Sequence, residues 1–356
     1  MPWKSPKKIN NLFSVSHDIG IDLGTATTLV YVKGRGIIMN EPSVVAINEK
    51  TGRVVAVGYD ASKMIGRTPA HIQAVKPLVN GVVSNFEITE EMLAYFLKKA
   101  RQAVPKKFMR PRVVIGVPSG ITNVERRAVR DAVRNAGGGE VFIVEEPMAA
   151  ALGIGLPVSE PVGSMIIDIG GGTTDIAVIS LGGIVQSKNL HIAGEKLNQD
   201  IVSYVRDEFK ILLGEKTAEE VKIAIGSVFK QDEPTEAAIR GRDLVTGLPR
   251  EVIISDADVR EAISVSIRRL VDTIKEVLEM TPPEVISDIM HRGIILVGSG
   301  ALIKGLPQLL EKELKIPIIV VDEPGTAVVR GTAVILDDLD RYRDVLADNE
   351  DELPPR

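Results

Sequence analysis

Apolar and polar residues alternate in short runs from about residue 18 to residue 58, and turns that contain Gly or Asn separate these runs. This period of two predicts β-strands that form a sheet. Residues 89–103 instead space their apolar side chains three and four positions apart, as a helix with one buried face does. The strands predicted in the first stretch are 19–22, 29–32, 37–39, 44–47 and 54–57.

Strands and helices alternate over the rest of the chain, which predicts α/β architecture. Thr122 with Glu125 forms a capping-box pair that opens a helix ending at glycines 137–139, and Thr217 with Glu220 forms a second such pair. Further helices are predicted after Pro147 and at 196–213, 217–228, 256–280, 305–314 and 325–337, strands at 113–117, 141–144, 165–169, 176–179, 294–297 and 316–321, and a β-rich stretch at 235–255.

The composition is that of a folded protein with about two domains: 356 residues, of which 44% are hydrophobic and 26% charged. The lack of cysteine excludes a disulfide framework, and four scattered histidines form no zinc-binding spacing. A net charge of −5 argues against nucleic acid as a partner. No apolar run long enough for a bilayer and no cleavable leader are found, so we expect a cytoplasmic protein. Residues 337–356 hold eight acids and three bases, which predicts a solvated tail.

One eight-residue pattern occurs twice in the chain. Residues 21–28 read Ile-Asp-Leu-Gly-Thr-Ala-Thr-Thr, and residues 167–174 read Ile-Asp-Ile-Gly-Gly-Gly-Thr-Thr. Each copy follows one predicted strand and leads into another. A repeat over so long a distance predicts two copies of one fold that face each other across a cleft, and not a solenoid.

The repeated pattern has the composition of a phosphate site. Turns of Gly, Thr and Ala can direct several backbone N–H groups at one anion, because their small side chains let the anion approach. An aspartate at the end of the preceding strand adds a carboxylate, the ligand that Mg²⁺ prefers. A single copy could be an ordinary hairpin, but two copies in register favour a polyphosphate site. The chain has no P-loop motif, and Gly298-Ser299-Gly300 lacks the third glycine of a dinucleotide fingerprint.

These motifs are similar to those of the actin-like ATPases and, among them, of the bacterial MreB family. The resemblance extends over residues 18–336. Residues 22–28 and 168–174 resemble the two phosphate motifs of the family, 145–151 resembles its first connecting motif, and 297–301 its adenosine motif. Shorter similarities lie at 40–43, 66–69 and 117–120.

The resemblance implies an actin-like α/β fold of two lobes, with duplicated α/β cores and a smaller inserted subdomain in each. A nucleotide would bind in the cleft between the lobes. The expected limits are 1–16 for a basic amphipathic N-terminal segment, 17–160 for lobe I with an insert at 37–76 and a return of the chain at 325–345, 161–324 for lobe II with an insert at 194–255, and 346–356 for an acidic tail.

The same resemblance assigns roles to single residues. Glu146 and Thr173 would be the catalytic residues that hold the attacking water, while Asp22 and Asp168 would bind Mg²⁺ through its water shell. From the residues alone, Glu146 could also be an acid that suits the N-terminus of a helix. The residues implied to bind ATP are Gly24, Thr25, Ala26, Thr27, Gly170, Gly171, Gly172, Thr173, Gly194, Glu195, Glu219, Lys222, Gly298, Ser299, Gly300 and Ala301.

Three positions depart from the family pattern. Thr27 stands where the family commonly has Asn, Glu220 where Arg is usual, and Ser299 where a Gly is usual. These departures leave nucleotide affinity and the choice between ATP and GTP open. Glu219 and Lys222, three positions apart, could also be a surface ion pair.

The activity implied by the resemblance is ATP hydrolysis coupled to polymerisation. The chain would form filaments of paired protofilaments at the inner face of the plasma membrane, and would guide cell-wall synthesis and rod shape together with the elongation machinery. The alternatives within the same fold are a small-molecule kinase and a chaperone-type ATPase. A kinase would need a catalytic base beside the γ-phosphate, and we identify no candidate acid for that role.

Two segments have the composition of membrane contacts. Trp3, Ile9, Leu12 and Phe13 lie in a leader that has three lysines and no acid before residue 17, which suits a short interfacial helix. The alternative is a disordered basic leader. The second segment places Phe108 and Met109 among Lys106, Lys107, Arg110 and Arg112, and a hydrophobic loop at this position touches the membrane in the family that the chain resembles.

Overall fold

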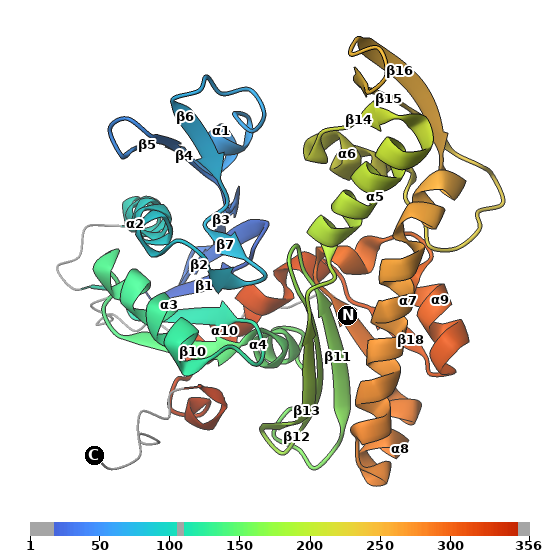
Figure 1. Cartoon of the computed structure of the whole chain (residues 1–356). Coiled ribbons are helices and arrows are strands. Elements are labelled where there is room, and N and C mark those ends of the chain that lie inside the picture. The colour runs from blue at the N-terminus through green and yellow to red at the C-terminus, as the bar shows by residue number, and fades with distance from the viewer. Residues whose placement is uncertain (1–17, 105–109, 348–356) are drawn as a thin grey trace.

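The computed structural model describes residues 18–104 and 110–347 of the chain. They form two lobes, each built on a five-stranded sheet, with two helices between the sheets and others outside them (Figure 1). Within these residues, no helix has both the length and the apolar character needed to cross a membrane.

The sheet of lobe I has the strand order β10-β9-β1-β2-β3. Strand β1 runs parallel to β9 and antiparallel to β2. Helices α2 (Phe86–Gln102) and α3 (Asn123–Asn135) pack on its outer face, and the predicted capping box of Thr122 and Glu125 opens α3. The strands are β1 (Ile19–Leu23), β2 (Thr27–Val32), β3 (Gly36–Pro42), β9 (Val113–Val117) and β10 (Val141–Glu145).

The sheet of lobe II has the order β13-β12-β11-β17-β18 and therefore repeats the topology of lobe I. Strand β11 is parallel to β17 and antiparallel to β12, as β1 is to β9 and β2. The strands are β11 (Ser164–Ile169), β12 (Thr174–Ser180), β13 (Gly183–Leu190), β17 (Ile294–Val297) and β18 (Ile318–Val320), and the helices beside this sheet are α7 (Asp256–Met280), α8 (Pro283–Arg292) and α9 (Leu306–Leu314). Helix α5 (Gly194–Phe209) follows β13 and packs on α7 and on the insert of this lobe.

Helices α4 (Glu146–Gly153) and α10 (Ala327–Asp337) lie between the two sheets and share an apolar core with both. They cross closely because glycines stand at the contact. A Cβ atom at Gly331 would lie 1.7 Å from the carbonyl oxygen of Ala149, and one at Gly153 would lie 2.1 Å from that of Ala327. Only glycine fits at these two positions. The close packing on α10 fixes the position of α4, which directly follows β10 at the cleft.

Each lobe carries a small insert at the same end of the molecule (Figure 1). The insert of lobe I is the sheet β5-β4-β6 with α1, and the small hairpin β7–β8 follows it. Strand β3 pairs with β2 in the main sheet, although the insert was expected to begin at about residue 37. The insert elements are β4 (Val45–Asn48), β5 (Arg53–Val57), α1 (Tyr59–Ser62), β6 (Ile72–Val75), β7 (Leu78–Val79) and β8 (Val82–Val83) in lobe I, and β14 (Ile211–Leu212), α6 (Glu215–Ile225), β15 (Glu236–Asp243) and β16 (Pro249–Ser255) in lobe II.

Two further predictions need correction, and two elements were missed. Helix α6 begins after Gly214, so Thr217 lies inside the helix and the second capping box does not form. Strand β13 and helix α8 were not predicted. The start of the predicted solvated tail instead packs on lobe I, where Leu346 pairs with Val144. The remaining elements are the 3₁₀ turns η1 (Ser299–Leu302), η2 (Pro324–Thr326) and η3 (Arg343–Val345).

Candidate active site between the lobes

The two repeated turns meet at the base of the cleft. A Cβ atom at Gly171 would lie 2.4 Å from the Cβ of Ala26, and one at Gly172 would lie 2.5 Å from Oγ1 of Thr25. Because the turns approach this closely, both positions of the second turn require glycine. The small residues of the motif therefore have two effects: they allow the close contact between the lobes, and they leave the backbone N–H groups accessible.

A cavity of about 390 Å³ lies around these turns, between the lobes. Its walls come from segments that are far apart in the sequence, and most of the expected site residues are among them. Those that line the cavity are Asp22, Gly24, Thr25, Ala26, Thr27, Glu146, Asp168, Gly170, Gly171, Gly172, Thr173, Gly194, Glu219, Lys222, Gly298, Ser299 and Gly300.

Two expected residues do not line the cavity. Ala301 is buried in the apolar core of lobe II, and Glu195 forms an ion pair with Lys76. Of the lining residues that were not expected, Ile223 lies one helical turn after Glu219, so the helical period carried a signal for it. The others are Leu29, Gly81, Leu302, Ile303, Pro324, Gly325 and Val328.

The carboxyl groups of Asp22, Glu146 and Asp168 line the cavity, and the charge of Asp175 acts on two of them. Burial raises the pKa of Asp22 to about 7, and burial followed by the charges of neighbouring acids raises the pKa of Glu146 and of Asp168 well above the ordinary range. The pKa of Asp175 is raised to about 6, again mainly by burial. Their mutual repulsion favours a bound cation or protonation of some of the group.

Asp175 was missed by the sequence analysis. The backbone N–H of Ser119, from lobe I, donates a 2.7 Å hydrogen bond to Oδ1 of Asp175, and Nδ2 of Asn189 lies 3.1 Å from both carboxylate oxygens. The equivalent position in the first copy of the repeat is Leu29. This difference between the copies was the available signal, because a carboxylate in place of leucine on a buried strand needs a partner.

The comparisons with known proteins identify the family of the chain. A family model described as MreB/Mbl protein matches residues 16–344. The chain belongs to the MreB/Mbl family.

Two curated members of the family align over almost the whole chain. The chain is 48% identical to the cell shape-determining protein Mbl of Bacillus subtilis over 326 residues, which cover 92% of this chain and 97% of that protein. It is 47% identical to the cell shape-determining protein MreB of Escherichia coli K12 over 342 residues, 94% of this chain and 97% of the relative.

The fold of this MreB/Mbl chain is also found in solved structures. The crystal structure of MreB5 of Spiroplasma citri bound to ADP is 38% identical, with a TM-score of 0.87 over 93% of this chain and 98% of that one. A second structure of the same protein, bound to AMPPNP, matches with the same TM-score. The expected family and the two-lobed actin-like α/β fold are therefore confirmed.

The acids suit a magnesium ion that keeps its water shell. Among the described residues, no cluster of three or more His, Asp or Glu side chains is arranged to hold a metal directly. Asp22 and Asp168 stand at matched ends of β1 and β11, and each faces the cavity. Two carboxylates beside a phosphate site are the donor set that Mg²⁺ takes when its other ligands are water and phosphate.

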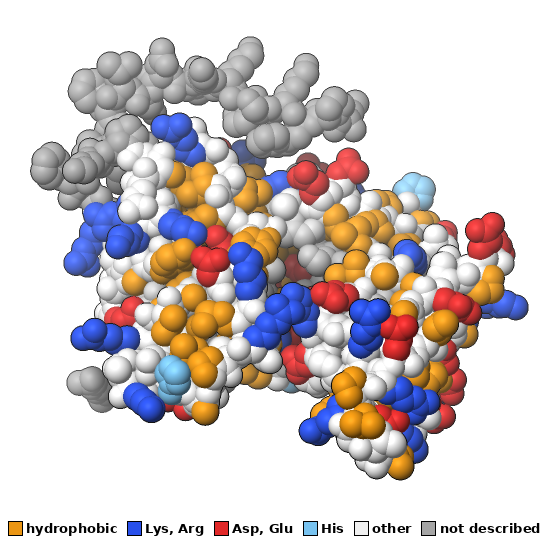
Figure 2. All heavy atoms as spheres, turned by 90° about the horizontal axis from the view of Figure 1, so that it is seen from above, with side chains coloured by type: hydrophobic (Ala, Val, Ile, Leu, Met, Phe, Trp, Pro, Cys, Tyr) orange, Lys and Arg blue, Asp and Glu red, His pale blue; other side chains and the backbone are white. Residues whose placement is uncertain are grey.

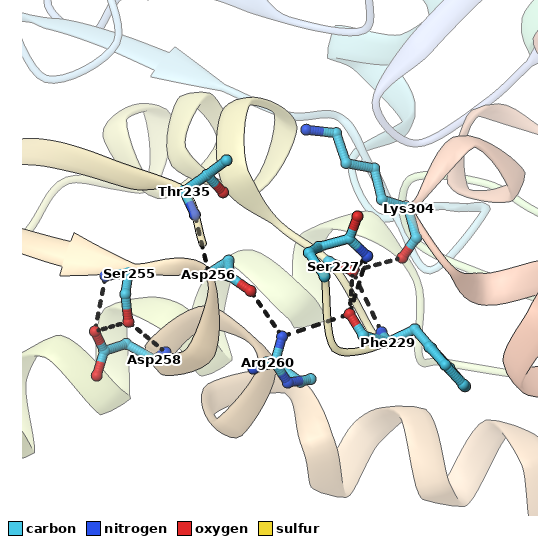
Figure 3. A network of polar contacts seen from close by, with 9 residues as sticks. Ser227, Phe229, Thr235, Ser255, Asp256, Asp258, Arg260 and Lys304 are labelled. Atoms are coloured by element: carbon cyan, nitrogen blue, oxygen red, sulfur yellow. Dashed lines mark hydrogen bonds and ion pairs between the residues drawn. The ribbon is translucent and has the colours of Figure 1, made fainter. Parts of the chain in front are cut away.

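The upper wall of the cavity is built by α6 and η1, and a polar network ties these elements together. Ser227 pairs with Lys304 through the backbone, and its Oγ lies 3.2 Å from the Lys304 carbonyl oxygen (Figure 3). The Nζ of Lys304 donates a 2.9 Å hydrogen bond to the carbonyl oxygen of Ala224, near the end of α6. Ile223 and Leu302, 69% and 64% exposed, line the cavity from these two elements. Their exposed apolar surface suits the flat face of a purine.

Ser299, one of the departures from the family pattern, is accommodated by a neighbouring glycine. A Cβ atom at Gly325 would lie 2.8 Å from Oγ of Ser299. The side chain of Ser299 therefore faces Gly325, which limits its intrusion on a nucleotide.

The raised pKa of Asp22 predicts a pH dependence of stability in the nucleotide-free protein. The folded form holds this proton up to about pH 7, whereas the unfolded chain releases it near pH 4, so stability should rise as the pH falls from 8 to 5. One fully linked proton contributes about 1.4 kcal/mol per pH unit. Urea unfolding at pH 5.5, 6.5 and 7.5 should show that the parent gains stability relative to Asp22→Asn. Parallel curves for the two proteins would contradict the assignment.

Proposed function

We propose that this MreB/Mbl chain binds Mg-ATP between its lobes, hydrolyses it, and polymerises into membrane-associated filaments that guide cell-wall synthesis and rod shape. The carrying observation is the pair of repeated turns that meet at one cavity with Asp22 and Asp168 at matched positions. The nucleotides in the Spiroplasma citri structures and the cell shape-determining relatives support the proposal. Under it the chain acts in the cytoplasm, at the inner face of the plasma membrane.

The backbone N–H groups of both turns would hold the phosphates, with Gly24–Thr27 on one side and Gly170–Thr173 on the other. Magnesium, when bound with the nucleotide, would neutralise phosphate charge. Glu146 lies at the start of α4, buried and facing the cavity, where its carboxylate can orient a water together with Thr173. These groups supply positioning and charge, the main requirements of phosphoryl transfer.

The membrane part of the proposal rests on composition. Trp3, Ile9, Leu12, Phe13, Phe108 and Met109 all lie outside the described residues. Of the cations grouped with the second segment, Arg112 donates to both carboxylate oxygens of Asp18, so its charge is already paired within lobe I. The exposed Arg110 remains a candidate for anionic lipid.

Sedimentation without vesicles tests polymerisation, and flotation with anionic vesicles tests membrane attachment, each with and without Mg-ATP. We expect ATP-dependent pelleting of filaments in the first assay and their co-flotation with vesicles in the second. A single anchor binds weakly, so attachment should require the many copies that a filament presents. Deletion of residues 2–16 together with Phe108→Ser and Met109→Ser should leave filaments that no longer float.

The outcomes separate the alternatives. A small-molecule kinase or a chaperone-type ATPase of the same fold would bind ATP and stay in the supernatant at every protein concentration. Filaments of the deleted variant that still float like the parent would place the membrane face elsewhere. Neutral vesicles serve as the control for the contribution of the lysines.

A further inference from the structure

Lys76 forms ion pairs that join the two lobes. It follows β6 in lobe I, and its Nζ lies 2.6 Å from Oε1 of Glu195 and 3.7 Å from Oε2 of Glu215, both in lobe II. Figure 2 shows basic and acidic side chains meeting where the lobes approach each other on the upper face. The side chains of Lys76 and Glu195 are only 36% and 24% exposed, so water screens their attraction less than it screens a fully exposed pair.

In lobe II, the residue that pairs with Lys76 is hydrogen-bonded through its backbone to the second repeated turn, Gly170–Thr173. Glu195 lies in the first turn of α5, and its backbone N–H donates a 2.8 Å hydrogen bond to the carbonyl oxygen of Gly171. The N–H of Gly194 donates to the carbonyl oxygen of Gly170 at 3.2 Å. Because of these two hydrogen bonds, a shift of Glu195 would also shift the turn that would hold the phosphates.

In lobe I, Lys76 leads into a hairpin that contacts the first repeated turn, Gly24–Thr27. Lys76 is followed by the β7–β8 hairpin, whose Asn80-Gly81 turn has positive φ at both residues, 52° and 76°, as a tight hairpin turn requires. The N–H of Gly81 donates a 2.8 Å hydrogen bond to Oγ1 of Thr25. A Cβ at Gly81 would lie 2.2 Å from Cγ of Pro118, so the hairpin also packs closely against the residue that follows β9. Residues 76–83 thus link the first turn to the second.

The charges around Lys76 favour this contact. Burial lowers the pKa of Lys76, but the hydrogen bond to Glu195 and the charges of Glu215 and Glu219 outweigh burial, so its pKa is raised and the ammonium group stays charged. Nearby Lys222 donates instead to the carbonyl oxygen of Gly194 at 2.8 Å. The two lysines therefore have separate partners at the N-terminus of α5.

We propose that the Lys76–Glu195 ion pair is a clamp that holds the two phosphate turns together over a bound nucleotide and sets how fast the nucleotide leaves. The clamp rests on the nucleotide binding proposed above. Neither side chain lines the cavity, so both are positioning residues, and their loss should leave the hydrolysis step itself unchanged.

The test is the rate at which a fluorescent ATP analogue leaves when chased by excess ATP, at a protein concentration below that needed for assembly. Lys76→Met keeps the apolar stem and removes the charge, and we expect release about fivefold faster, with single-turnover hydrolysis unchanged. Raising the salt concentration should speed release from the parent and barely affect the variant. Lys63→Met is the matched control, because it removes an ion pair with Asp60 that lies within the insert of lobe I.

Charge reversal distinguishes a clamp from a general structural effect. Lys76→Glu alone should release the analogue fastest, and adding Glu195→Lys should restore most of the parental rate. If the parent binds the analogue while Lys76→Met releases it at the parental rate, or if the reversed pair gives no rescue, the clamp is wrong and the proposed function stands. A parent that binds no nucleotide overturns the proposed function, and the clamp with it.

Discussion

A chain carrying Asp22→Asn and Asp168→Asn is expected to fold normally and to bind ATP about a hundredfold more weakly in the presence of Mg²⁺. Binding should fall because the amides cannot neutralise a hydrated cation next to the phosphates. Folding should survive because both carboxyls have raised pKa values without a cation, and an amide has the shape of the protonated acid. Asp168 packs closely on Gly298, since its Oδ1 would lie 2.4 Å from a Cβ at that glycine. Asparagine is therefore used because it keeps the shape of the side chain.

Calorimetric titration of ATP with Mg²⁺ and with a chelator measures this effect. The parent should lose most of its affinity in the chelator, and the double variant should show the same weak binding in both conditions. Asp200→Asn is a suitable control, because Asp200 pairs with Lys196 on α5 and does not line the cavity. Parental affinity in the double variant would contradict the placement of the cation and the proposed function with it.

The repeated motif was the strongest predictor of the fold. Residues 21–28 and 167–174 are local patterns, and the two sheets that contain them have matching strand orders. Element types were predicted well where the pattern was long, as for α7 (Asp256–Met280), and the four-residue strand β17 (Ile294–Val297) was also predicted with its bounds. Turn residues predicted the element boundaries less well. The double proline after α7 was taken only as a helix end, whereas Pro283 also begins α8.

Candidate site residues were predictable where one motif carries both position and chemistry. Asp22, Glu146 and Asp168 each stand at the end of a strand or the start of a helix that leads into the cavity. Asp175 and Gly325 were not predicted, because their roles depend on partners from distant segments: Ser119 for the first, Ser299 for the second. A local pattern does not identify such partners, although the change from Leu29 to Asp175 between the two copies of the repeat was a signal that Asp175 needs one.

Glu146 offers the second large effect, on the rate of hydrolysis. Its side chain lies at the start of α4, held by the tight packing of α4 on α10, and it faces the cavity while only 8% exposed. Burial and then the charges of Asp175, Asp22 and Asp168 raise its pKa well above the ordinary range. A bound cation would offset that repulsion, so the carboxylate would become a competent base only when Mg-ATP is present.

Glu146→Gln should therefore slow hydrolysis about a hundredfold while ATP affinity changes less than about threefold, because positioning of the water acts in the transition state. Single-turnover phosphate release measures the rate, and the fluorescent analogue measures binding. Glu145→Gln is the matched control: the side chain precedes the same helix, makes no capping hydrogen bond and does not line the cavity. If Glu146→Gln releases phosphate at the parental rate, Glu146 only suits the positive end of α4, and the water must be oriented by Thr173 or by the backbone of the turns.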